Sequence, residues 1–218
     1  MTESINYPRL YEYRFHGIDQ TTRQAVWNEI GPFIYARLGS PMRVLDPCAG
    51  RCEFLNAVDR PERWSVDQVD NTEFRAPGIT SVTADIFAAD LPIDFFDGVF
   101  VSNFLEHLFT QEDVARFLAK MVTVMQSGGR IAILGPNFRY CSKEYFDCAD
   151  HTLALTHLAV AEHLYAAGFT VDEVIPRFLP FSFRGALKPS PALTRWYLKM
   201  RPAWRILGKQ FLILASKP

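Results

Sequence analysis

Several features are scarce in this sequence, and each scarcity argues against a class of protein. The chain has only four cysteines and no Cys-x-x-Cys pair, so neither a disulfide framework nor a paired zinc site is indicated. No run approaches the ~18 consecutive apolar residues that a membrane-spanning helix needs. The first residues lack a basic segment followed by an apolar run, so no secretory signal is expected there. Together these absences predict a cytoplasmic protein with reduced thiols.

Acidic residues are missing from the last part of the chain. Residues 1–173 hold 14 Lys and Arg and all 24 Asp and Glu, whereas residues 174–218 hold nine Lys and Arg and no acid. An acidic body disfavours nucleic acid as a partner, because its backbone is negatively charged. The basic segment is also aromatic, so residues 184–209 could contact a membrane surface or an anionic carrier. The alternative is a solvated insertion that balances the acidic body.

The chain has 218 residues, 49% of them hydrophobic, which suffices for one domain with a large core. Short apolar runs alternate with helical periodicity, a pattern typical of βαβ units and a mostly parallel sheet. The predicted strands are 42–47, 63–68, 79–85, 96–103, 130–136, 169–176 and 210–217. The main predicted helices are 21–38, 111–126 and 156–167. Residues 137–154 are expected to be irregular.

The segment VLDPCAGRCEF, residues 44–54, joins the first strand to a helix through a tight turn. A polar ligand can lie over the start of such a helix, since the first backbone N–H groups there are free. Asp67 ends the second strand, where a carboxylate can accept hydrogen bonds from both hydroxyls of a ribose. A nicotinamide cofactor is the weaker alternative, because the turn lacks two glycines of the Gly-x-Gly-x-x-Gly pattern.

VLDPCAGRCEF resembles the Asp-x-Gly-x-Gly-x-Gly motif of class I S-adenosylmethionine-dependent methyltransferases of the type 11-like group. Cys48 and Cys52 stand at the first and third glycine positions, and Asp67, Asp85, FDGVFVSNFLEHL and SGGRIAIL follow in the family's order. The segments PNFRYCSKEYFD, ADHTLALT, PRFLPF and WRILGKQFLILASKP resemble a bacterial subgroup often found among genes for surface polysaccharides. The resemblance implies one Rossmann-like α/β domain over residues 1–218. Its doubly wound sheet would have seven strands, the last antiparallel, with helices on both faces.

The resemblance also implies that S-adenosylmethionine is the cofactor and S-adenosylhomocysteine the product. The turn after the first strand would approach the amino-acid part of the cofactor, Asp67 the ribose and Asp85 the adenine. The implied cofactor-binding residues are Asp46, Cys48, Ala49, Gly50, Asp67, Gln68, Asp85, Ile86, Asn103 and Phe104.

His107 and His151 are the candidate catalytic residues. Methyl transfer to a hydroxyl benefits from a base, and histidine serves this purpose near neutral pH. His107 follows the fourth strand, at the edge where open α/β sheets bind ligands, and His151 has acids nearby in sequence that can orient its ring. The alternative for each is a packing or loop role. His157 and His163 are expected on the surface, and no spacing of acids and histidines indicates a metal site.

Arg139, Tyr140 and Tyr145 are candidate acceptor-binding residues, because Arg binds phosphate or carboxylate and Tyr stacks on rings. Residues 1–40 are expected to form a helical lid, and residues 177–207 a basic and aromatic insertion beside the acceptor. The favoured function is O-methylation of a small-molecule acceptor, a sugar or glycan precursor. The alternatives are O- or N-methylation of a small secondary metabolite, and a binding or scaffold module that keeps the fold without catalysis.

Overall fold

The computed structural model describes residues 6–17, 19–59, 62–180 and 190–218. The helices are α1 (Tyr7–Phe15), α2 (Gln20–Arg37), α3 (Glu53–Asn56), α4 (Gln111–Val124), α5 (Phe138–Cys141), α6 (His157–Ala166), α7 (Pro191–Lys199) and α8 (Arg201–Leu207), with 3-10 turns η1 (Leu105–His107) and η2 (Tyr145–Asp147). The strands are β1 (Arg43–Asp46), β2 (Glu62–Asp67), β3 (Ile79–Thr83), β4 (Phe96–Ser102), β5 (Met125–Pro136), β6 (Thr170–Ile175) and β7 (Gln210–Ser216).

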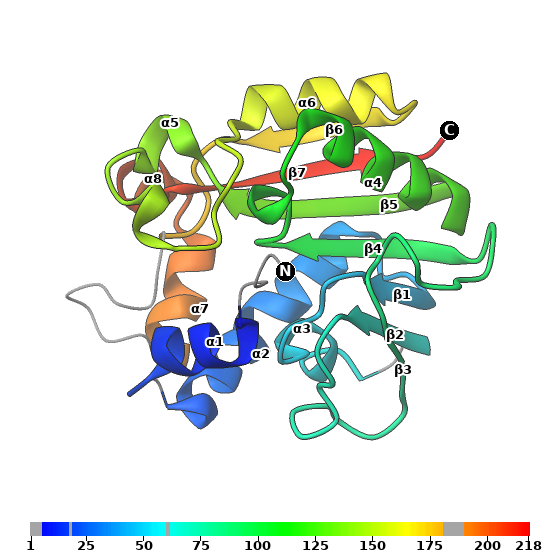
Figure 1. Ribbon diagram of the computed structural model, residues 1–218. Helices are drawn as coiled ribbons and strands as arrows, with labels where there is room; N and C mark the ends of the chain where they lie inside the picture. The colour runs from blue at the N-terminus through cyan, green and yellow to red at the C-terminus, as the bar shows by residue number, and fades with distance from the viewer. Residues whose placement is uncertain (1–5, 18, 60–61, 181–189) are drawn as a thin grey trace.

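The strands form one sheet in the order β3-β2-β1-β4-β5-β7-β6 (Figure 1). β1 to β5 pair in parallel, and β7 runs antiparallel between β5 and β6. The strand order reverses between β1 and β4, and a reversal of this kind opens a crevice at the carboxyl ends of the strands. These findings confirm the predicted Rossmann-like fold with seven strands and an antiparallel last strand.

Helices cover both faces of the sheet because its central strands are apolar on both sides. Successive side chains of a strand point to opposite faces. Accordingly, Val99 and Val101 of β4 pack in a cluster with α4 and α6, while Phe100 packs in a second cluster with α2, α7 and α8. The doubly covered sheet therefore leaves its edge at the strand ends as the place for a ligand.

Two predicted boundaries were wrong at the junction of α4 and β5. The predicted capping box is present, with Thr110 and Asp113 each bonding the other's backbone N–H, but α4 ends at Val124. β5 then begins at Met125, which pairs with Phe96 across a register shift. The chain bulges between Met125 and Arg130, where Gly128 has a φ of +77°, and it passes close to β4: a Cβ at Gly129 would lie 3.1 Å from the Phe96 carbonyl oxygen.

The stretches predicted without helices contain short ones. Residues 137–154 include α5 and η2, and the described part of 177–207 includes α7 and α8. Residues 181–189 of that insertion, and residues 1–5 of the expected lid, lie outside the described residues. Of the helices in the described ranges, none is both long and apolar enough to cross a membrane.

Candidate functional site

Asp46 closes β1 and lies beneath the turn that follows it. Its residue is only 3% exposed, and its Oδ1 accepts a hydrogen bond from the Cys48 N–H at 3.3 Å. Burial raises the pKa of Asp46 to about 8, and the nearby Asp67 and Glu53 carboxyls add to the rise. The Asp46 carboxyl thus holds the start of the turn through the Cys48 N–H.

The turn itself presents backbone to open space. Gly50 has a φ of +51°, and a Cβ built there would meet nothing within 4 Å. Ala49 is anchored to β2 by its N–H, which donates to the Val66 carbonyl at 3.0 Å. Of the two cysteines at family glycine positions, only Cys52 has a positive φ, 57°. This left-handed backbone conformation is unfavourable by roughly 1–2 kcal/mol for a residue with a side chain, and Cys48 does not adopt it.

Asp67, at the end of β2, is bonded to this turn. Its Oδ2 accepts from the Gly50 N–H at 2.7 Å and its Oδ1 from the Val69 N–H at 2.9 Å. Burial raises the pKa of Asp67, and these backbone N–H groups partly offset the rise. A carboxylate oxygen has two acceptor sites, so each can still accept from a ribose hydroxyl.

The ends of β3 and β4 continue the same edge. Asp85 Oδ2 accepts from Gln68 Nε2 at 2.9 Å, and Ile86 is buried beside them. Asn103 is exposed at the end of β4 with a φ of 49°, a conformation that Asn tolerates better than most residues. Phe104 packs on Phe117 with ring centroids 5.0 Å apart. The predicted cofactor residues therefore follow the carboxyl ends of β1 to β4, and the open turn and acceptor oxygens fit S-adenosylmethionine.

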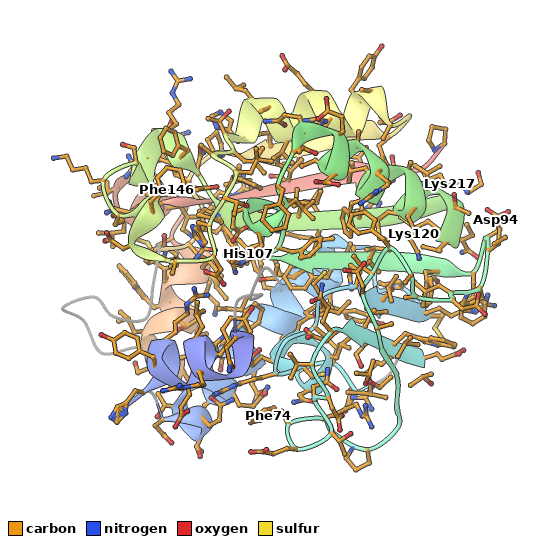
Figure 2. The ribbon with its side chains drawn as sticks, in the orientation of Figure 1. Phe74, Asp94, His107, Lys120, Phe146 and Lys217 are labelled. Carbon is orange, nitrogen blue, oxygen red and sulfur yellow. The ribbon has the colours of Figure 1, made fainter. Side chains whose placement is uncertain are left out.

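His107 and His151 lie together at the same edge. In Figure 2 His107 is at the end of β4, with Phe146 in the loop above it and α1 below. The His107 and His151 ring centroids are 5.1 Å apart. His107 Nδ1 lies 2.9 Å from the Asp150 carbonyl oxygen and 3.5 Å from its carboxylate Oδ2. A carbonyl accepts only, so Nδ1 carries the proton and Nε2 is the basic nitrogen.

Three charged residues at this cluster were missed or left unassigned by the sequence analysis. Arg14 of α1 forms an ion pair with Asp150, whose side chain is 2% exposed. Burial raises the pKa of Asp150, but the Arg14 hydrogen bond and the His107 charge outweigh it and leave the pKa lowered. Glu106 is also buried, which raises its pKa to about 7. The sequence signal for Glu106 is its place in SNFLEHL, an acid within an apolar segment.

Burial also sets the protonation of His151. It lowers the pKa of His151 to about 4, and the adjacent His107 contributes to the same effect. His151 is therefore a neutral imidazole at neutral pH.

The cluster also offers ligand atoms for a metal, which the sequence analysis did not predict. One atom each from Glu106, His107 and His151 lie within 4.8 Å of one another. The Arg14 guanidinium, which interacts with Glu106 as well as Asp150, opposes a cation here by charge repulsion. We therefore interpret the cluster as acid–base machinery.

The three candidate acceptor residues differ in accessibility. Arg139 is exposed, and Tyr140 is 37% exposed beneath the Arg177 guanidinium. Tyr145 is fully buried, its Oη donates to the Leu153 carbonyl at 2.8 Å, and its ring packs against His151. Burial therefore leaves Tyr145 in a position to hold His151 but not to touch an acceptor.

The predicted surface position of His157 was wrong. This residue is 7% exposed, and its Nδ1 lies 2.9 Å from Asn137 Nδ2. It begins α6 beneath the Tyr140 ring, where the helix packs against the loop after β5.

Comparisons with known proteins agree with this geometry. Residues 40–133 match the family model described as a methyltransferase domain. No curated protein matches the chain. A S-adenosylmethionine-dependent methyltransferase from Archaeoglobus fulgidus has a TM-score of 0.61 at 21% identity, covering 97% of this chain and 100% of that one.

Two further solved structures share the fold. The 1,6-didemethyltoxoflavin-N1-methyltransferase of Burkholderia thailandensis has a TM-score of 0.60 at 19% identity, covering 100% of this chain and 92% of that one. Geranyl diphosphate C-methyltransferase from Streptomyces coelicolor has a TM-score of 0.62 at 12% identity, covering 86% and 79%. Residues 40–133 thus match a methyltransferase domain, and the chain has the fold of solved S-adenosylmethionine-dependent methyltransferases.

Proposed function

We propose that the protein methylates a hydroxyl group of a sugar or glycan precursor. The observation that carries this proposal is the partly buried His107–His151 pair, which lies at the edge of the sheet where the candidate cofactor residues gather. A hydroxyl, unlike an amine or a thiolate, has to lose a tightly held proton as it is methylated, so a base at this position is useful. The sugar class of acceptor follows from the resemblance of the outer segments to methyltransferases associated with surface polysaccharides.

His107 is the base in this proposal. S-adenosylmethionine, when bound, supplies an electrophilic methyl group on a sulfonium. As the acceptor oxygen takes the methyl group, its proton passes to His107 Nε2, so that a methyl ether, neutral S-adenosylhomocysteine and an imidazolium result. The Asp150 carboxylate, 3.5 Å from His107 Nδ1, stabilises that imidazolium.

His151 has a positioning role. Its lowered pKa keeps it uncharged, so it does not compete for the proton. Its ring packs between those of Tyr145 and His107 and limits the movement of the base. Aligning acceptor and methyl group about 3 Å apart supplies much of the acceleration in such displacements.

The experiment is transfer of a radiolabelled methyl group from S-adenosylmethionine to nucleotide sugars, lipid-linked sugars and aromatic heterocycles. We expect sugar acceptors to be labelled, and His107→Asn to lower kcat by about 10²–10⁴-fold without weakening cofactor binding. His163→Asn is the matched control, because His163 bonds Gln111 on the surface, away from the strand ends. Labelling of the heterocycles alone would favour a secondary-metabolite enzyme, and full activity of His107→Asn would remove the base mechanism.

A further inference from the structure

The outward faces of α7 and α8 carry exposed apolar side chains that no element of the described ranges covers. Leu193, Trp196 and Met200 are 40%, 52% and 37% exposed. Leu193 and Trp196, at i and i+3, lie on one side of α7, and Met200 follows the end of that helix. Ile206 and Leu207, at the end of α8, are 73% and 48% exposed. We call these five residues the α7–α8 face.

The opposite sides of both helices fix them rigidly to the domain. Tyr197 Oη donates to the Phe178 carbonyl at 2.6 Å, and Trp204 Nε1 donates to the Tyr197 carbonyl at 2.8 Å. Trp204 also packs edge-on against Phe33 of α2. The inner sides of α7 and α8 are therefore packed in the core, and the α7–α8 face is the side that these contacts leave exposed.

Positive charge borders the α7–α8 face. Lys199 and Arg205 are exposed, and no hydrogen bond or ion pair joins either to an acid in the described ranges. Arg195 and Arg201 lie beside them, but Arg195 pairs with Glu29 of α2 and Arg201 with Glu173 of β6. The whole segment 174–218 contains no acidic residue. Apolar side chains bordered by cations are the pattern of a helix that lies in the interface of an anionic membrane.

A groove lies between α8 and Tyr140, one of the candidate acceptor residues. It has a volume of about 350 Å³ and is lined by Tyr140, Glu173, Arg177, Trp204 and two arginines of α8. Tyr140 belongs to α5, which follows directly from β5. α8 in turn leads into β7, whose first residue pairs with the last residue of β5. The α7–α8 face and the His107 cluster thus adjoin the same edge of the sheet.

We propose that the α7–α8 face docks on the surface of an anionic phospholipid bilayer. Trp196 and Ile206 enter the interface, and Lys199 and Arg205 meet the negative headgroups. Docking in this orientation brings the acceptor edge to glycan precursors carried on lipids; this last consequence rests on the proposed function, whereas the docking itself does not.

The test is co-sedimentation of the full-length protein with vesicles. We expect binding to vesicles of equal parts phosphatidylcholine and phosphatidylglycerol, little binding to phosphatidylcholine alone, and weakening by salt, which screens exposed charges. The double variant Trp196→Ser/Ile206→Ser should lose ~10-fold or more of the affinity, because the buried apolar area is removed. Lys199→Glu/Arg205→Glu should abolish the preference for phosphatidylglycerol.

Ile93→Ser is the matched control. Ile93 is 69% exposed, close to the value for Ile206, and its neighbour Asp94 lies at the opposite edge of the molecule (Figure 2). Equal binding by the control and the double variant would overturn the proposal, as would equal binding to both kinds of vesicle. Self-association of the wild type that the double variant abolishes, without vesicle binding, would assign the face to a second copy instead. Methyl transfer to a soluble acceptor should survive in the double variant, so loss of docking and failure of the proposed function are distinguishable.

Discussion

His107 receives its orientation from a residue that is itself held from the other end of the chain. Asp150 accepts from His107 through its backbone carbonyl and pairs with Arg14 through its carboxylate. The carboxylate is nearly buried, and the Arg14 guanidinium that pairs with it stabilises its charge. Asp150 therefore links His107, the proposed base, to Arg14 of the N-terminal helix α1.

Asp150→Asn tests the ionic part of this linkage, because it removes the charge of the side chain and keeps its size. The pKa of Asp150 is lower in the folded state than in the unfolded state, where it is near 4. The ionised carboxylate therefore stabilises the folded protein at a pH above about 4, and this stabilisation is lost as the pH falls through the folded-state pKa. We expect the variant to lose about 2–3 kcal/mol at pH 7 in urea unfolding, and the difference from wild type to shrink below about pH 4. Asp147→Asn, an exposed neighbour, is the control. A difference that persists unchanged in acid would contradict the ionic role.

Asp46 should show the opposite pH dependence. Its folded pKa of about 8 lies above its unfolded value, so the folded state holds a proton that the unfolded state releases, and stability falls as the pH rises toward 8. Asp46→Asn keeps an oxygen for the Cys48 N–H and cannot ionise. Denaturant unfolding should therefore find that the variant gains stability relative to wild type as the pH rises from 5 to 9, by several kcal/mol. A difference between the variant and wild type that does not change with pH would show that the pKa of Asp46 is not raised in the folded protein.

At the scale of elements, α1 is joined to the site by the ion pair between Arg14 and Asp150. It has nine residues, which is too short for a stable isolated helix, so its order depends on partners such as Asp150. The lid role of residues 1–40 remains a prediction, and α1 is the part of it that touches the catalytic cluster.

Arg14→Gln should therefore loosen α1. We expect faster amide hydrogen exchange across α1 and a lower kcat, since Asp150 loses its partner and His107 its orientation. Arg9→Gln is the matched control, because Arg9 is an exposed residue of the same helix. Equal exchange rates in the two variants would mean that the ion pair does not hold the helix.

Elements stabilised by contacts that are local in sequence were predicted from the sequence, and elements stabilised by distant contacts were not. α4 was predicted closely because its capping box and apolar stripe are local in sequence. α7 and α8 were not predicted, since Tyr197 and Trp204 bind partners distant in sequence and the basic composition resembles a solvated loop. The strand-end acids were found because parallel strands bring their carboxyl ends together. The Arg14–Asp150 pair joins residues 136 positions apart, which no spacing rule reveals.

At the scale of the whole molecule, the faces of the sheet pack against helices, and the candidate site lies at the edge formed by the carboxyl ends of the strands. Its two faces are filled by helices, and α5, α7 and α8 lie on the side of the molecule toward which β4 and β5 run (Figure 1). The candidate cofactor residues and the histidine pair follow the carboxyl ends of β1 to β4. The acidic body and the basic final segment also differ in charge, which gives the molecule a preferred side toward an anionic surface. The central claim on which the account depends is that Asp67 and the turn over Gly50 bind S-adenosylmethionine.

Calorimetric titration of the protein with S-adenosylmethionine and S-adenosylhomocysteine tests that claim most directly. We expect micromolar dissociation constants, about −8 kcal/mol, and loss of binding in Asp67→Ala, because the ribose hydroxyls lose their acceptor. Asp90→Ala, an exposed acid on the chain beyond β3, should bind as wild type does. Absence of binding by the wild-type protein, or undiminished binding by Asp67→Ala, would contradict the account.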